Sequence, residues 1–211
     1  MYVGRIVAVG RNMAGAATAL YRVSSRSFPN RHSVLLDQSV AIVPKPGHES
    51  DIQKNPYIAY NCLRLVGDYA VVTNGSHTDP LSEKLAAGLP PRDALAYVML
   101  SMDYEHDSLN TPRIAGVVSA NASRGWLGIV RKDALLVKEF DLQPGRLFYV
   151  CTYERNEPGL AQCSADFNAD SASEACAHIL GQGGEFTQFE KPVSAACAML
   201  DAQGQFKVAV A

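Results

Sequence analysis

The sequence predicts an α+β domain in which antiparallel sheets are covered by helices. Two observations lead to this prediction. Short segments with alternating apolar residues are separated by turn residues and follow one another as hairpins along most of the chain. Two blocks with apolar residues at helical spacing interrupt them, near residues 76–105 and 171–184. Because strands and helices occur in separate runs, we expect a layered fold with two sheets and helices on their faces.

The first third of the chain contains strand signals. Five segments share the alternation: residues 2–10, 17–25, 34–43, 57–67 and 69–75. The first two are expected to pair as a hairpin across the turn RNMAGA, and the last two across Gly67 and Asp68. The third is expected to be one strand that the segment PKPG closes.

Two helices are predicted in the first helical block. Asp79 is the expected N-cap of the first helix, Pro80 its first helical residue and Gly88 its end. The second helix is expected over residues 91–105. The shorter block at residues 171–184 begins with serines and ends with glycines, as short helices often do.

Further strands are expected after the first helical block and at the end of the chain. They comprise residues 113–120, 125–140 and 146–154, and a final hairpin over 194–211 around Gln203 and Gly204. No linker of low complexity divides the chain, so residues 1–211 are expected to form a single domain.

Composition excludes several classes of function. A net charge of −2 argues against nucleic-acid binding, which needs a basic face. No run approaches the about 20 apolar residues of a membrane span, and Arg5 interrupts the first apolar run, so neither a membrane segment nor a signal peptide is expected. Five scattered cysteines without a C-x-x-C pair indicate reduced thiols in the cytoplasm. The histidines lack metal-ligand spacing, so no metal is expected.

Arginines without neighbouring acids are the first functional signal. The stretch RVSSRSFPNR, residues 22–31, has no carboxylate, and the first acid of the chain is Asp37. The arginines before Asp37 are Arg5, Arg11, Arg22, Arg26 and Arg31. Guanidinium groups bind carboxylates and phosphates through two parallel hydrogen bonds, so the cluster indicates a site for a small anion. The alternative is that each arginine pairs with an acid elsewhere in the fold.

Two further polar stretches flank predicted elements. The segment NPYIAYNCLR contains Tyr57, Tyr60, Asn61 and Arg64, an unusual density of donors for a strand, although a tyrosine in a strand is often only a core residue. The segment TNGSHTD joins a strand to a helix N-terminus, where anions often bind. The segment LNTPR adds Asn110 and Arg113.

The segment SMDYEHD is the third signal. Asp103, Glu105 and Asp107 are expected at the C-terminal end of the second helix, where the helix dipole and mutual repulsion both disfavour ionisation. A carboxyl group with a raised pKa can accept a proton near neutral pH. The alternative is a solvated helix end.

The chain resembles the archaeal-type inosine monophosphate (IMP) cyclohydrolase family. The segments that carry the resemblance are VSSRSFPNR, NPYIAYN, NGSHTD, MDYE and LNTPRIA, in that order, with GGEF at residues 183–186 and the opening GRI.AVGRN. Residues 130–169 match least. The resemblance implies a four-layer αββα sandwich similar to N-terminal-nucleophile hydrolases, and a homo-oligomer such as a tetramer.

The resemblance also implies an activity, which is ring closure of a formamido-imidazole-carboxamide ribonucleotide to IMP. Water is released and no cofactor is used. Arg31, Tyr60 and Glu105 match the family's catalytic positions. Glu105 suits the base that takes the amide proton, and Arg31 and Tyr60 suit groups that stabilise the charge on the formyl oxygen.

The remaining polar residues are expected to bind the purine nucleotide, with Arg26 as the first choice for its phosphate. The full set is Arg26, Ser27, Asn30, Asn61, Arg64, Ser76, His77, Asn110 and Arg113.

Two other functions are compatible with parts of the sequence. An amidohydrolase of the N-terminal-nucleophile type would need an exposed N-terminal Cys, Ser or Thr, but Tyr2 follows Met1. A non-catalytic nucleotide-binding module would account for the arginines but not for the acids of SMDYEHD.

Overall fold

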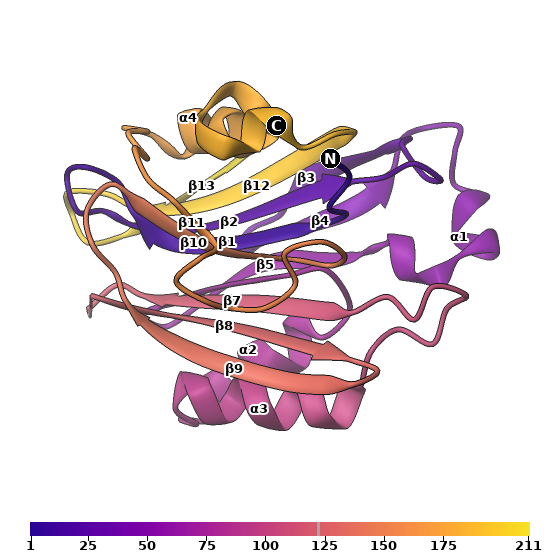
Figure 1. Ribbon diagram of the computed structural model, residues 1–211, viewed down its shortest axis with the longest axis horizontal. Coiled ribbons are helices and arrows are strands. Elements are labelled where there is room, and N and C mark those ends of the chain that lie inside the picture. The colour runs from indigo at the N-terminus through magenta and orange to yellow at the C-terminus, as the bar shows by residue number, and fades with distance from the viewer. Residues whose placement is uncertain (122) are drawn as a thin grey trace.

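Two antiparallel sheets packed face to face form the centre of the computed structural model, which describes residues 1–121 and 123–211 (Figure 1). The first sheet has the order β11 (Cys163–Ser164), β10 (Arg146–Cys151), β1 (Ile6–Arg11), β2 (Ala17–Ser24), β12 (Pro192–Leu200) and β13 (Phe206–Val210). The second has the order β3 (Arg31–Leu35), β4 (Ser39–Pro44), β5 (Tyr60–Val66), β6 (Tyr69–Thr73), β7 (Arg113–Ser119), β8 (Arg124–Arg131) and β9 (Ala134–Asp141).

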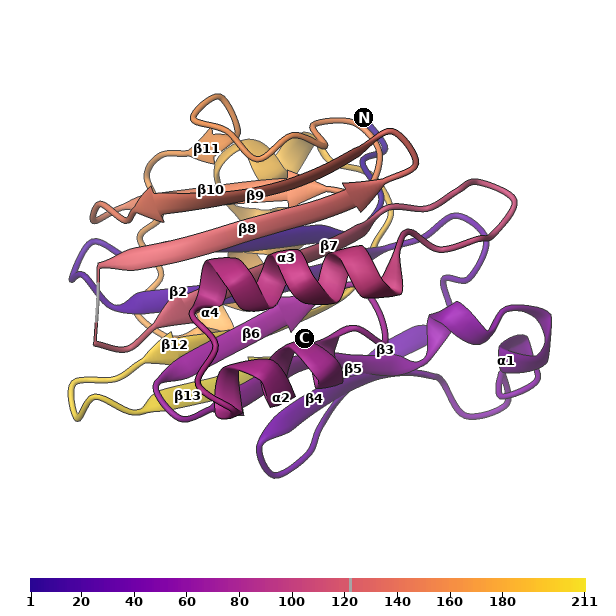
Figure 2. The ribbon, with the colours of Figure 1, turned by 90° about the horizontal axis from the view of Figure 1, so that it is seen from below.

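Helices cover the outer faces of both sheets. Helices α2 (Thr78–Ala86) and α3 (Pro91–Met102) lie on the second sheet, as Figure 2 shows from below. Helix α4 (Ala172–Ala177), the π turn η2 (His178–Gln182) and the 3-10 turn η3 (Gly184–Gln188) lie on the first sheet. The short elements α1 (Asp51–Lys54) and η1 (Pro56–Ile58) lie at one end of the molecule. The predicted α+β class is therefore confirmed. No helix within the described residues is long and apolar enough to cross a membrane.

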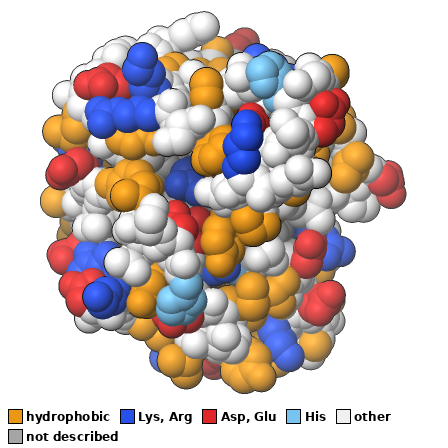
Figure 3. Space-filling model, turned by 90° about the vertical axis from the view of Figure 1, so that its right-hand side faces the viewer, with side chains coloured by type: hydrophobic (Ala, Val, Ile, Leu, Met, Phe, Trp, Pro, Cys, Tyr) orange, Lys and Arg blue, Asp and Glu red, His pale blue; other side chains and the backbone are white. Residues whose placement is uncertain are grey.

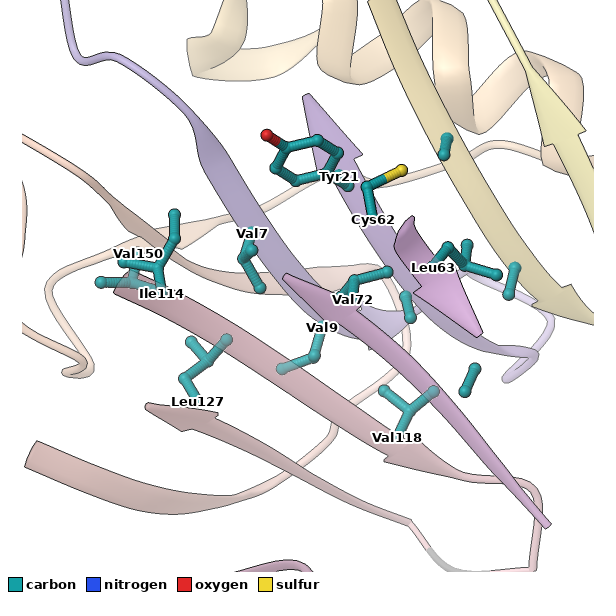
Figure 4. Close-up of a cluster of buried hydrophobic side chains, with 14 of the residues drawn as sticks. Val7, Val9, Tyr21, Cys62, Leu63, Val72, Ile114, Val118, Leu127 and Val150 are labelled. Carbon is teal, nitrogen blue, oxygen red and sulfur yellow. The ribbon is translucent and has the colours of Figure 1, made fainter. Parts of the chain in front are cut away.

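The alternation of side chains along the strands explains the layers. In β1, Val7 and Val9 point into the space between the sheets (Figure 4), while Ile6 and Ala8 pack beneath α4. Successive residues of a strand face opposite sides, and here both sides are covered. Strands buried on both faces need apolar residues at nearly every position, so β1 is an almost continuous apolar run.

Most predicted strand pairings are confirmed. Strand β1 pairs with β2, β5 with β6, and β12 with β13, each antiparallel. The prediction of one strand over residues 34–43 is wrong. The chain turns there between β3 and β4, and the Leu36 amide donates to the Ser39 carbonyl over 2.8 Å. Two apolar runs separated only by Asp37, Gln38 and Ser39, without glycine or proline, gave too weak a turn signal.

The predicted ends of the first two helices also need correction. His77, rather than Asp79, occupies the N-cap of α2, so Asp79 lies within the first turn. Helix α3 ends at Met102, because Asp103 takes a left-handed backbone conformation with φ of 55°. Glu105 therefore lies in the loop after the helix and not on its last turn.

Candidate active site

A cleft of about 210 Å³ opens at the end of the molecule where α1 and η1 lie. Its lining includes the guanidinium groups of Arg5, Arg26 and Arg31 and the hydroxyl groups of Ser25 and Ser27. Figure 3 looks onto this end, where a hollow near the middle of the face shows basic and acidic atoms. Three of the five arginines that precede Asp37 in the sequence therefore meet at one cleft.

The chain connectivity explains why these residues meet. Arg5 directly precedes β1 in the first sheet, and Arg31 opens β3 in the second. Residues 25–30 connect β2 to β3 and so cross from one sheet to the other at this end. The serine- and arginine-rich stretch is therefore the crossing between the sheets, and its polar side chains surround the open end of the layer between them.

Glu105 is a fully buried carboxyl group behind this cleft. Arg5 Nη2 lies 3.4 Å from its Oε2 atom, and Arg113 Nη1 lies 3.9 Å from its Oε1 atom. Burial raises the pKa of Glu105 to about 7, although Arg5, Arg113 and Arg31 each act to lower it. The prediction of a raised pKa agrees with the structure, but its cause is burial in a loop and not the dipole of α3.

The loop that carries Glu105 is held by Asp107. The Asp107 carboxylate accepts hydrogen bonds from the amides of Leu109 and Thr111 and from the Thr111 hydroxyl. The Thr111 carbonyl in turn accepts from the Glu105 amide over 2.8 Å. Asp107 therefore fixes the backbone at Glu105, in addition to its smaller contribution to raising the pKa of that residue.

Tyr60 lies between the two sheets beside a second tyrosine. Its hydroxyl group and that of Tyr21 are 2.6 Å apart, and the two rings meet edge to face. Tyr21 comes from β2 in the first sheet and Tyr60 from β5 in the second, so this hydrogen bond joins the sheets. Both hydroxyls belong to the buried layer next to the cleft rather than to its lining.

Arg31 is nearly inaccessible, whereas Arg26 is exposed. Arg31 is only 2% exposed, and its Nε donates to the Phe28 carbonyl, while its Nη1 has no hydrogen-bond partner among the described residues. Arg26 lies over the Tyr2 ring and forms an ion pair of 3.6 Å with Glu190. The buried guanidinium of Arg31 is thus the more rigid of the two.

Several other predicted binding residues lie outside the cleft lining. Asn61 and Arg64 both donate to the Asp79 carboxylate. Asn30 lies 3.2 Å from the His48 ring nitrogen Nδ1. Ser76 is exposed, Asn110 is an exposed turn residue with φ of 49°, and Arg113 is buried beside Glu105.

His77 is fully buried behind Glu105 and Arg113. Its Nε2 atom lies 3.0 Å from the Ile114 carbonyl, which can only accept, so Nε2 carries the proton. Burial, assisted by the Arg113 charge, lowers the pKa of His77 to about 3. The imidazole is therefore neutral at ordinary pH.

Arg22 shows that the arginine stretch serves two purposes. Its guanidinium is fully buried on the outer side of the first sheet and donates to the carbonyls of Ile179 and Phe189 and to the Ser24 hydroxyl. Its partners are neutral oxygens at the start of η2, directly after η3 and on its own strand. Arg22 thus joins β2 to the helical layer and takes no part in the cleft.

Sequence reasoning placed Arg5 in the arginine cluster without a specific role and did not select Tyr2, Asn55 or Tyr153, yet all four line the cleft. A signal existed for Arg5, because it interrupts an apolar strand segment. No comparable signal marked Tyr153, which lies in the region that matched the family least.

Several known proteins are similar to this chain over nearly its whole length. A family described as IMP cyclohydrolase-like protein matches residues 2–204. A protein of Methanosphaera stadtmanae named IMP cyclohydrolase is 48% identical over 198 residues, which cover 94% of both chains. Proteins of that name from Methanocella arvoryzae and Methanocaldococcus jannaschii are 49% and 42% identical. These alignments cover 94% and 97% of this chain, and 92% and 96% of the respective relatives.

Proposed function

Because this chain belongs to the IMP cyclohydrolase-like family, we propose that it closes the last purine ring. The substrate is 5-formamidoimidazole-4-carboxamide ribonucleotide and the products are IMP and water. The observation that carries the proposal is Glu105, a buried carboxyl group with a pKa of about 7 behind a cleft that three arginines line. The fold we propose is the αββα sandwich of N-terminal-nucleophile hydrolases, which is supported by helices on the outer faces of two packed sheets.

The reaction requires two proton transfers to one oxygen. The carboxamide nitrogen loses a proton and attacks the formyl carbon, and the formyl oxygen becomes a hydroxyl group. The formamide nitrogen then loses its proton, and the hydroxyl group leaves as water with the formation of a C=N bond. A carboxyl group with a pKa near the working pH can accept each proton and return it to the oxygen. Glu105 has this property.

Arg5 controls access to Glu105 in this scheme. Glu105 has no exposed surface, and Arg5, whose side chain is 12% exposed, lines the cleft and covers the Oε2 atom. Substrate oxygens that attract the Arg5 guanidinium would uncover Oε2 for the amide proton. Arg31, buried and incompletely hydrogen-bonded, is the group that best suits the developing charge on the formyl oxygen. We propose that the Tyr60 hydroxyl group donates a hydrogen bond to the same oxygen.

The test is to incubate the protein with the formylated ribonucleotide and separate the products by chromatography. We expect IMP in equal amount to the substrate consumed. An amidohydrolase would instead release formate and leave the amino-imidazole carboxamide ribonucleotide. Binding of the nucleotide without any turnover would favour the non-catalytic module. Either of these results would refute the proposal.

Replacing Arg26 with alanine is expected to raise KM about tenfold and to change kcat little. A phosphate contact is remote from the reacting atoms and is made equally in the ground and transition states. Tenfold corresponds to about 1.4 kcal/mol, a modest value because the Arg26 side chain is 60% exposed and already pairs with Glu190. Steady-state kinetics provide the measurement, and Arg92→Ala, an exposed arginine on α3, is the control. A fall in kcat at unchanged KM would instead assign Arg26 to the chemical step.

A further inference from the structure

Three buried polar atoms converge beside Gly75. They are Glu105 Oε1, Arg113 Nη1 and His77 Nδ1, and none has a hydrogen-bond partner among the residues that the structure describes. A Cβ atom on Gly75 would lie 2.8 Å from Arg113 Nη1, 3.3 Å from His77 Nδ1 and 3.4 Å from Glu105 Oε1. Apart from atoms of Gly75 and its two chain neighbours, these are the three heavy atoms nearest to that position. The space between the three atoms is thus bordered by polar groups whose hydrogen-bonding capacity is unused.

The hydrogen-bonding capacity of the three atoms is defined. Arg113 can only donate, and the ionised Glu105 can only accept. His77 donates from Nε2 to the Ile114 carbonyl, so the neutral ring presents a lone pair at Nδ1. The space therefore offers one donor and two acceptors. Arg113 Nη1 and Glu105 Oε1, 3.9 Å apart, are too distant to satisfy each other directly.

The matching ligand accepts one hydrogen bond and donates two. An anion would be repelled by Glu105 and could not donate, while a cation would be repelled by Arg113. A water molecule fits, because buried waters typically make about three hydrogen bonds to polar groups that lack other partners.

We propose that a water molecule beside Gly75 accepts from Arg113 Nη1 and donates to Glu105 Oε1 and His77 Nδ1, and that His77 is thereby a positioning residue for Glu105. The sequence led us to expect a substrate-binding role for His77. Its complete burial and its place behind Glu105 favour this indirect role. The catalytic consequence rests on the proposed function, whereas the water site itself does not.

The water would determine which oxygen of Glu105 reacts. With Oε1 held by the water, Oε2 remains beside Arg5 and the cleft. A hydrogen bond to the carboxylate favours its ionised form, so loss of this bond should raise the pKa of Glu105. The other charged groups around Glu105 are Arg5 before β1, Arg31 on β3, Arg113 on β7 and Asp107 in the same loop. None of them changes in the variants described next.

Two amide substitutions distinguish the contact that His77 makes through Nδ1 from the contact that it makes through Nε2. In His77→Asn the amide oxygen can occupy the place of Nδ1 and keep the acceptor for the water, while the bond to Ile114 is lost. In His77→Gln the amide nitrogen can keep the bond to the Ile114 carbonyl, while the acceptor for the water is lost. Carbon NMR of the protein without substrate measures the titration midpoint of Glu105. The pH profile of kcat/KM provides an independent measurement of the same midpoint.

We expect His77→Gln to raise the Glu105 midpoint by about 0.5–1 pH unit in both measurements, and His77→Asn to leave it within about 0.3. Gly75→Ala, whose Cβ atom would come within 2.8 Å of Arg113 Nη1 and crowd the three atoms, should act like His77→Gln. A high-resolution crystal structure of the unaltered protein should show an oxygen within hydrogen-bonding distance of all three atoms.

Two outcomes would overturn the proposal: equal midpoint shifts in the two His77 variants, or three ordered side chains in the crystal with no oxygen between them. The crystal structure of the unaltered protein tests the water site even if a variant does not fold. Because the structure and the NMR titration use no substrate, they can support the water site even if the enzyme assay refutes the proposed function.

Discussion

Replacing Glu105 with glutamine is expected to lower kcat by about 10²–10⁴. Glutamine keeps the shape of the side chain and removes its basicity, so the loss should equal the usual contribution of general acid–base catalysis. Nucleotide affinity should hold or improve, because a negative charge near an anionic substrate is removed. Single-turnover kinetics and equilibrium binding measure the two quantities separately.

The pH dependence of kcat/KM provides a second test of Glu105→Gln. With a pKa of about 7, Glu105 is mostly protonated at pH 6 and cannot accept a proton, so kcat/KM of the unaltered protein should rise through about pH 7. In Glu105→Gln this acid limb should be absent. Asp103→Asn is the appropriate control, because the Asp103 side chain is 48% exposed and its carboxylate pairs, within the described part of the chain, with the Tyr104 amide and the His106 ring. Asp107→Asn is a poorer control, since Asp107 holds the loop. Retention of most activity by Glu105→Gln would mean that the base lies elsewhere.

The same substitution should stabilise the fold at alkaline pH. The pKa of Glu105 is raised from 4.5 to about 7 in the folded protein, so folding favours the protonated form. This contribution is fully present below about pH 4.5 and is lost as the pH rises through about 7. At pH 8 the buried carboxylate should cost about 3 kcal/mol, a cost that the neutral glutamine side chain would avoid. Urea unfolding at pH 8 and pH 5 measures the difference, which should shrink at the lower pH. Equal stability changes at both pH values would contradict the linkage.

Replacing Arg31 with methionine should lower kcat by about 10²–10³ with a smaller effect on KM. Removal of one donor from a preorganised charge-stabilising site typically has an effect of this size. Arg31 is suited to such a role because it is buried and its Nε is tied to the Phe28 carbonyl. Arg31→Lys keeps the charge without the planar fork and should retain an intermediate rate. If instead both variants raise KM and leave kcat unchanged, Arg31 binds the phosphate and does not act on the formyl oxygen.

The strand pairing was largely predictable from sequence, because alternation and turn residues are local signals. The same local signals could not assign the arginines to a site. Arg22 and Arg26 belong to one stretch, yet Arg22 points to the outer helical layer and Arg26 to the cleft. Arg22 lies in β2, whereas Arg26 lies in the connection after that strand, where the alternation of a strand no longer predicts the direction of a side chain.

The raised pKa of Glu105 was predicted, but its largest cause, burial, was not, and the predicted repulsion by Asp107 contributes less. The acidic segment stood out because acids are disfavoured at a helix C-terminus. No glycine or proline marks the end of α3 at Met102, so the sequence did not reveal that the chain leaves the helix there. Burial of Glu105 depends on Arg5 and on the turn at Gly75, both distant in sequence. Such contacts leave no pattern in the residues around Glu105.

The separation of Arg5 and Glu105 along the chain also bears on how activity is acquired during folding. Their ion pair spans 100 residues, and the Tyr21–Tyr60 hydrogen bond joins strands of different sheets. Contacts of this kind form only after long loops have closed, which is entropically costly and happens when the sheets dock. A hairpin or an isolated sheet, however well formed, would hold only part of the proposed proton-transfer site. Enzymatic turnover is therefore a reporter of sheet docking, and a partly folded chain with complete secondary structure would be inactive.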